Sequence, residues 1–192
     1  AYQSGKWAFV SDYFRLKALY EQGGVYLDTD VELLRPFGDL LELSGFAGFE
    51  DAEHVATCVL GAEKEHGFFR QAMELYEGRT FLREGGEPDL TTNVEILTGL
   101  LGRNGLEPDG ARQSVMGMEI FPAEYFSPRS LETGKLTKTG NTYAIHWFEA
   151  SWQTGSQRFH RKVAQVIGKK NTERLKKLLG RSGGPESSGR SG

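Results

Sequence analysis

The sequence predicts a single α/β domain, and three observations carry this prediction. The chain has 192 residues, which is the length of one ordinary domain with a sizeable core. Its composition is that of a globular protein, with 38% apolar and 26% charged residues. Short apolar runs that fit strands alternate with longer segments in which apolar residues recur at helical spacing. We therefore expect mixed strands and helices around one core.

The first predicted element is a helix over residues 5–22, because Phe9, Tyr13, Leu16 and Tyr20 recur at helical spacing. Two glycines at 23 and 24 end this helix. The later elements follow from apolar runs and turn residues. They are a strand over 25–30, a turn with a short helix over 36–43, strands over 46–49 and 55–62, helices over 68–76 and 92–101, strands over 119–122 and 142–147, and a helix over 159–179.

The charges are distributed unevenly along the chain. Residues 1–157 carry a net charge of −11, whereas residues 158–177 carry +7. An acidic body argues against nucleic acid as a partner. The sequence therefore predicts a folded body over 1–157, a basic amphipathic helix over 158–179 and a disordered tail over 180–192, which has no apolar residue.

The basic helix over 158–179 has two readings. It fits a helix packed on the domain with a solvated face, and it also fits a peripheral contact with an anionic membrane surface. No apolar run reaches the roughly 20 residues of a membrane helix. Cys58 is the single cysteine, so no intrachain disulfide forms. A cytoplasmic location is expected, at most peripheral at the inner face of the plasma membrane.

The pattern Asp28-Thr29-Asp30 is the strongest chemical signal in the chain. If residues 25–30 form one strand, Tyr26, Asp28 and Asp30 share a face near its carboxyl end. Two carboxylates that close repel each other, and a divalent cation such as Mn²⁺ or Mg²⁺ relieves the repulsion. A surface turn with two solvated aspartates remains an alternative. A haloacid-dehalogenase-like phosphatase is another, because an aspartate after an apolar strand is the nucleophile there.

Two further groups of residues fit the same site. Asp12 and Arg15 are three apart on the first helix, where a guanidinium suits phosphate and a carboxylate suits sugar hydroxyls. Their alternative reading is an exposed intrahelical salt bridge. His146 is a candidate metal ligand that suits Mn²⁺ better than Mg²⁺, and its alternative is a core histidine. Trp147 is expected in the core, and His54, His66 and His160 at the surface.

These motifs resemble a known family. The segments A-F-V-S-D-Y-F-R at 8–15 and G-G-V-Y-L-D-T-D-V at 23–31 look like the sugar-binding region with the DXD motif. That region marks glycosyltransferases related to the yeast initiation-specific α-1,6-mannosyltransferase and to bacterial capsular polysaccharide enzymes (glycosyltransferase family 32-like). Large clostridial glucosylating toxins share it distantly. The resemblance continues loosely at 61–64 and 121–126 and strengthens at 146–152.

The resemblance implies a GT-A-like fold and a metal-dependent, retaining transfer of a sugar from a nucleotide-diphosphate donor. The acceptor would be a glycan, free or lipid-linked, in capsular or other surface polysaccharide synthesis. It assigns residues to two roles, binding of the metal and binding of the donor. The metal ligands are Asp28, Asp30, His146 and, as a lesser candidate, Ser151; the donor-binding residues are Asp12, Arg15, Tyr26, Asp28, Asp30 and Trp152. By its position Asn93 is expected on the acceptor side, and no catalytic base is assigned.

One feature departs from the family pattern. The family's N-terminal strand and helix, which help to hold the base, have no counterpart in residues 1–192. We therefore expect a GT-A-like fold that lacks these two elements. A non-catalytic domain that binds nucleotide sugars is a further alternative. Thr92 and Asn93 also fit the start of a helix, with no role beyond its N-cap.

Overall fold

The computed structural model describes residues 7–77, 79, 89 and 91–148. The described parts of 1–130 and 136–149 form one compact unit, which holds every helix and strand given below. Residues 131–135 are assigned to a second unit. The predicted helix over 158–179 and the predicted tail over 180–192 lie outside the described residues.

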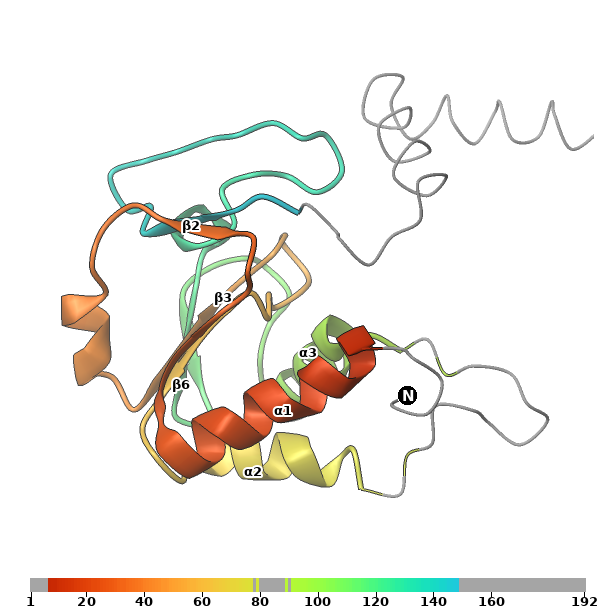
Figure 1. Cartoon of the computed structure of the whole chain (residues 1–192). Coiled ribbons are helices and arrows are strands. Elements are labelled where there is room, and N and C mark those ends of the chain that lie inside the picture. The colour runs from red at the N-terminus through yellow and green to blue at the C-terminus, as the bar shows by residue number, and fades with distance from the viewer. Residues whose placement is uncertain (1–6, 78, 80–88, 90, 149–192) are drawn as a thin grey trace, which may run out of the picture. The chain divides into compact units, whose positions relative to one another are not determined.

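A five-stranded mixed sheet is the centre of the fold (Figure 1). Its strands, in spatial order, are β1 (Gly24–Leu27), β4 (Val59–Ala62), β3 (Gly45–Gly48), β6 (Met118–Phe121) and β5 (Gln113–Val115). Only β3 and β6 are parallel neighbours, and the other adjacent pairs are antiparallel. Because β1 and β3 are both antiparallel to β4, the strands β1, β3 and β6 all run in one direction. Their carboxyl ends therefore reach the same edge of the sheet.

Helices cover one face of this sheet (Figure 1). They are α1 (Trp7–Gln22), α2 (Gly67–Glu74) and α3 (Asn93–Arg103). Two short 3-10 helices, η2 (Gly38–Glu42) and η3 (Ala123–Tyr125), are not part of this layer (Figure 1). Helix α1 packs on α2, β1 and β4. Thr92 begins α3 with a capping box, in which its hydroxyl accepts a hydrogen bond from the Glu95 amide at 3.2 Å. None of the helices in the described part is both long and apolar enough to cross a bilayer.

The core consists of two clusters, one on each face of the sheet. Successive side chains of a strand point to opposite faces, so Ala47 and Phe46 belong to different clusters, as do Ile120 and Phe121. On the helical face, the cluster is built around Leu16 of α1 and Leu97 of α3, which are fully buried. The opposite cluster is largely aromatic. It contains Phe37, Phe46, Phe121, Phe126 and Tyr143.

A second sheet, the two-stranded ribbon β2–β7, begins directly after the acidic motif. Strand β2 (Val31–Leu33) pairs antiparallel with β7 (Ala144–His146), although more than a hundred residues separate them. Val31 is opposite His146 in this pairing. The ribbon thus brings the two sequence regions that carry the metal-site prediction to one place.

Most predicted elements are confirmed, with three differences in the strands. The predicted strand over 55–62 is confined to Val59–Ala62, and Val55 makes only an isolated bridge to Phe49. The sequence predicts neither strand β2 nor strand β5. Strand β5 is joined to β6 by Met116 and Gly117, whose φ values of 55° and 78° match a tight two-residue hairpin turn. The third difference concerns the acidic motif.

Candidate metal centre

The prediction of one strand over residues 25–30 is wrong at its end. Strand β1 stops at Leu27, and Asp28, Thr29 and Asp30 form a turn. The amide of Val31 donates to the carbonyl of Asp28 at 3.1 Å, which closes the turn and starts β2. The Asp28 amide donates to the Cys58 carbonyl at 2.9 Å, so the turn is held against β4. The two aspartates therefore share a site through the turn and not through strand alternation.

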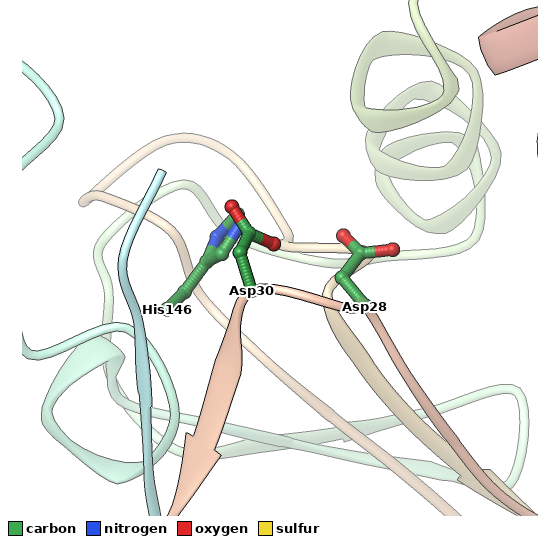
Figure 2. Close-up of side chains that lie close together, drawn as sticks. All are labelled: Asp28, Asp30 and His146. Atoms are coloured by element: carbon green, nitrogen blue, oxygen red, sulfur yellow. The ribbon is translucent and has the colours of Figure 1, made fainter. Parts of the chain in front are cut away.

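His146 lies beside this turn because β7 pairs with β2. The backbone amide that follows it, on Trp147, donates to the carbonyl of Asp30 at 3.0 Å. Its Nε2 is 3.3 Å from Oδ1 of Asp30. One ligand atom from each of Asp28, Asp30 and His146 lies within 4.8 Å of the others. Figure 2 shows the three side chains next to one another and directed to the same side.

This set of ligands fits a divalent cation. Carboxylate oxygens suit Mg²⁺ and Mn²⁺, and an imidazole favours a transition metal. Burial lowers the pKa of His146, and the nearby carboxylates of Asp30 and Asp28 only partly oppose this effect. The ring is therefore neutral near pH 7, as metal binding requires. Its Nδ1 is buried and has no hydrogen-bond partner among the described residues, whereas Nε2 faces the Asp30 carboxylate.

Arg15 links the helix to the acidic turn. Its Nη1 donates to Oδ1 of Asp28 at 2.9 Å and to the carbonyl of Thr57 at 3.0 Å. Its Nη2 is 3.0 Å from Oδ1 of Asp12, and its guanidinium stacks on the Tyr26 ring at 4.7 Å. The Tyr26 hydroxyl also donates to Oδ1 of Asp28, at 2.8 Å. Because only 8% of the Arg15 side chain is exposed, the reading of an exposed salt bridge is wrong.

Asp12 and Asn93 meet at the helical end of this network. Burial raises the pKa of Asp12 to about 6, and the Arg15 guanidinium opposes the rise. The Asn93 side chain lies beside Asp12 and, like Arg15, lowers the pKa of Asp12. Asn93 itself is buried, and its Oδ1 accepts a hydrogen bond from the Tyr76 hydroxyl at 3.0 Å. The structure therefore brings Asn93 to the Asp12 side of the site, while its acceptor role stays a prediction.

Some predicted site residues are elsewhere or outside the described part. Ser151 and Trp152 lie outside the described residues. Trp147 is only partly buried, and its indole N–H donates to Glu32 at 2.9 Å, so its assignment to the core is wrong. The prediction for His66 is also wrong. It is buried and caps α2, with its Nδ1 accepting from the Phe68 amide.

One acidic residue of this region was missed. Glu50 follows β3 at the sheet edge that also carries Asp28, and burial raises its pKa to about 7. Asp51 and Asp28 raise the pKa further, and His54 opposes them. No motif in the sequence marks Glu50. Its only signal is its position directly after a short apolar strand.

Residues 2–47 match the family model of the glycosyltransferase sugar-binding region containing the DXD motif. The match supports a glycosyltransferase. It covers α1, β1, the acidic turn and β2, and ends within β3. Within the matched range lie Asp12, Arg15, Asp28 and Asp30, whereas His146 lies beyond it. The mixed sheet of parallel and antiparallel strands is compatible with a glycosyltransferase-like fold.

The chain is also similar to an Arabidopsis thaliana protein that is described as uncharacterized. The two are 31% identical over 121 residues, which cover 62% of this chain and 18% of the plant protein. The aligned part thus spans about a fifth of the length of that relative. No solved structure matches the chain.

Proposed function

We propose that the chain is a metal-dependent glycosyltransferase that moves a sugar from a nucleotide-diphosphate-sugar donor to a glycan. The observation that carries this proposal is the group of Asp28, Asp30 and His146 within 4.8 Å, with the Arg15 guanidinium on the same turn. Carboxylates with an imidazole suit a cation, and a guanidinium suits a phosphate. Binding of a nucleoside diphosphate calls for a cation and for a positively charged side chain at the phosphates. The match to a sugar-binding region supports a donor that carries a sugar on this diphosphate.

Each residue has a defined part in this proposal. Asp28, Asp30 and His146 hold Mn²⁺ or Mg²⁺, which supplies Lewis-acid stabilisation of the departing diphosphate. Arg15 orients Asp28 and offers charge to the phosphates, and Asp12 binds a sugar hydroxyl. Tyr26 fixes the Asp28 carboxylate. Ser151 and Trp152 complete the set as proposed ligands of the metal and the diphosphate.

The finer parts of the proposal rest on the sequence resemblance. They are a GT-A-like fold, retention of the anomeric configuration, hexosyl transfer, and a surface or capsular polysaccharide as acceptor. A peripheral membrane contact through 158–179 would place a cytoplasmic enzyme beside a lipid-linked acceptor. The phosphatase reading has no observation in its favour among the described residues. There, Oδ1 of Asp28 already accepts hydrogen bonds from Arg15 and Tyr26.

Titration calorimetry with UDP-glucose and GDP-mannose tests the proposal. We expect binding in Mn²⁺ that is lost in EDTA and weakened at least tenfold by Asp30→Asn or His146→Ala. Glu63→Gln is the matched control, because Glu63 is an exposed carboxylate outside the site. Absence of metal-dependent binding to either nucleotide sugar would contradict the donor site. Binding without transfer or hydrolysis would instead indicate a non-catalytic sugar-nucleotide-binding domain.

A further inference from the structure

The sheet edge that carries Asp28 also carries a second carboxyl, on Glu50. Strands β1 and β3 run in the same direction, so the residues that follow them emerge at one edge. Asp28 follows β1 directly, and Glu50 comes two residues after the end of β3. One strand, β4, separates them, which puts their backbones on the order of 10 Å apart.

The backbone around Glu50 is held by several hydrogen bonds. Phe49 bridges Val55, and the amide of Glu50 donates to the carbonyl of His54 at 2.7 Å. Asp51 accepts from the amides of Glu53 and His54, both at 2.8 Å, so its side chain closes the turn. Glu50 therefore stands on an ordered hairpin turn and has a defined position at the edge.

The Glu50 carboxyl is partly buried and lies among negative charges. Within the described residues, no hydrogen bond or ion pair to this carboxyl is present. Burial and the negative charges of Asp51 and Asp28 raise its pKa to about 7, with His54 opposing. Groups perturbed in this way concentrate at sites that bind or transform ligands.

We propose that the Glu50 carboxyl binds the incoming hydroxyl of the acceptor, at the edge of the sheet that also carries Asp28. This inference rests on the proposed glycosyltransferase function. Arg15 of α1 reaches this edge at Asp28 and Thr57 and also contacts Asp12. Arg15 and Asp12 are the side chains proposed to bind the diphosphate and the donor sugar. Glu50 lies farther along the same edge, at a separation that a single sugar ring and its neighbour can span. A carboxylate there accepts a hydrogen bond from a hydroxyl and orients it toward the donor.

Donor hydrolysis tests this assignment, because water is then the acceptor and its identity is known. The probes are UDP-glucose and GDP-mannose with Mn²⁺, and kcat and KM are measured for the full chain. Glu50→Gln should lower kcat at least tenfold and leave the KM of the donor within about twofold. Glu50→Asp should recover part of kcat. The matched control is Glu53→Gln, an exposed residue of the same turn, which should behave as the wild type.

The possible failures are distinguishable. If Glu50→Gln leaves both constants unchanged, or raises KM alone, the acceptor-side assignment is wrong while the proposed function stands. A wild-type chain that binds the donor but never hydrolyses it also overturns the assignment, since water should reach this carboxyl. If the wild type binds neither nucleotide sugar, the proposed function fails and the role of Glu50 fails with it.

Discussion

At the scale of single residues, Arg15 is the side chain on which the site depends most. Its guanidinium contacts the carboxylates of Asp12 and Asp28, the backbone carbonyl of Thr57 and the Tyr26 ring, and so links α1 to β1 and to the segment before β4. An exposed pair of this kind contributes a few tenths of a kcal/mol, but Arg15 is nearly buried. Its removal would leave Asp12 and Asp28 without their shared cation. The cost of removal is therefore far larger than the spacing of Asp12 and Arg15 in the sequence indicates.

We expect Arg15→Leu to lower the free energy of unfolding at pH 7 by about 3 kcal/mol or more, the magnitude seen when one member of a buried ion pair is removed. Urea unfolding measures the change. Arg70→Leu is the control, because Arg70 is 63% exposed and only 3.9 Å from Glu74. Its effect should stay below about 0.5 kcal/mol. Equal effects of the two substitutions would show that the Arg15 network does not stabilise the fold.

Glu50 makes the stability of the fold depend on pH. Its folded pKa of about 7 is above its ordinary value, so the folded state binds the proton more tightly than the unfolded chain. This contribution is fully present below the unfolded pKa and is lost as pH rises through about 7. We expect Glu50→Gln to be more stable than wild type by roughly 1–3 kcal/mol at pH 8.

Urea unfolding at pH 5 and pH 8 checks the Glu50 prediction. The advantage of Glu50→Gln over the wild type should shrink at pH 5, where the wild-type carboxyl is protonated in the fold. Glu53→Gln should show no such pH-dependent difference, because Glu53 is exposed. A pH-independent gap between Glu50→Gln and wild type would refute the raised pKa.

At the scale of elements, the turn between α1 and β1 sets the direction of β1, which leads into the acidic turn at 28–30. Gly23 ends the helix with φ at 68°, a conformation that side chains other than glycine rarely adopt, and its amide donates to the Leu19 carbonyl at 2.8 Å. A Cβ at Gly23 would lie 2.8 Å from the Lys64 amide nitrogen. Both the backbone and its surroundings therefore require glycine here.

We expect Gly23→Ala to destabilise the protein by more than 1 kcal/mol, the order of the cost of a left-handed conformation plus a backbone clash. Gly102→Ala is the matched control, because Gly102 lies inside α3 and a Cβ there meets nothing within 4 Å. That substitution should stabilise the protein by roughly 0.5–1 kcal/mol. Thermal unfolding of both variants decides the matter, and the same sign for the two would contradict this account of the turn.

At the scale of the whole unit, the candidate metal centre joins two sheets. Asp28 follows a strand of the five-stranded sheet, whereas Asp30 and His146 belong to the ends of the ribbon β2–β7. A cation bound by all three would tie the ribbon to the sheet. Because a ligand that binds only the folded state stabilises that state, bound cation should raise the free energy of unfolding.

Mn²⁺ should raise the Tm of the wild type, and at a concentration about 100 times its Kd the gain is about 2.7 kcal/mol. His146→Ala should abolish this gain, because it removes the ribbon's ligand. His54→Ala is the control, since His54 pairs with Asp51 away from the cluster. Differential scanning calorimetry with and without EDTA gives the result. An equal Mn²⁺ response in the two variants would exclude His146 as a ligand.

The local patterns of the sequence predicted most of the elements and named the residues of the candidate site. Helical spacing over 5–22, the glycines that end it and the acidic pair are local signals, and α1, β1 and the capping box of α3 agree with them. Apolar periodicity and turn chemistry act between near neighbours, so they can be read from the chain alone. The pairing of Asp12 with Arg15 is of the same kind.

Only the tertiary structure decided how these parts meet. The turn at 28–30, the pairing of Val31 with His146 and the burial of Arg15 depend on contacts between residues far apart in the chain. Glu50 carries no motif, and its raised pKa follows from its surroundings in the fold. The sequence by itself thus determined which residues could bind a metal and a diphosphate. Long-range strand pairing, which no local pattern encodes, decided that Asp28, Asp30 and His146 form one centre.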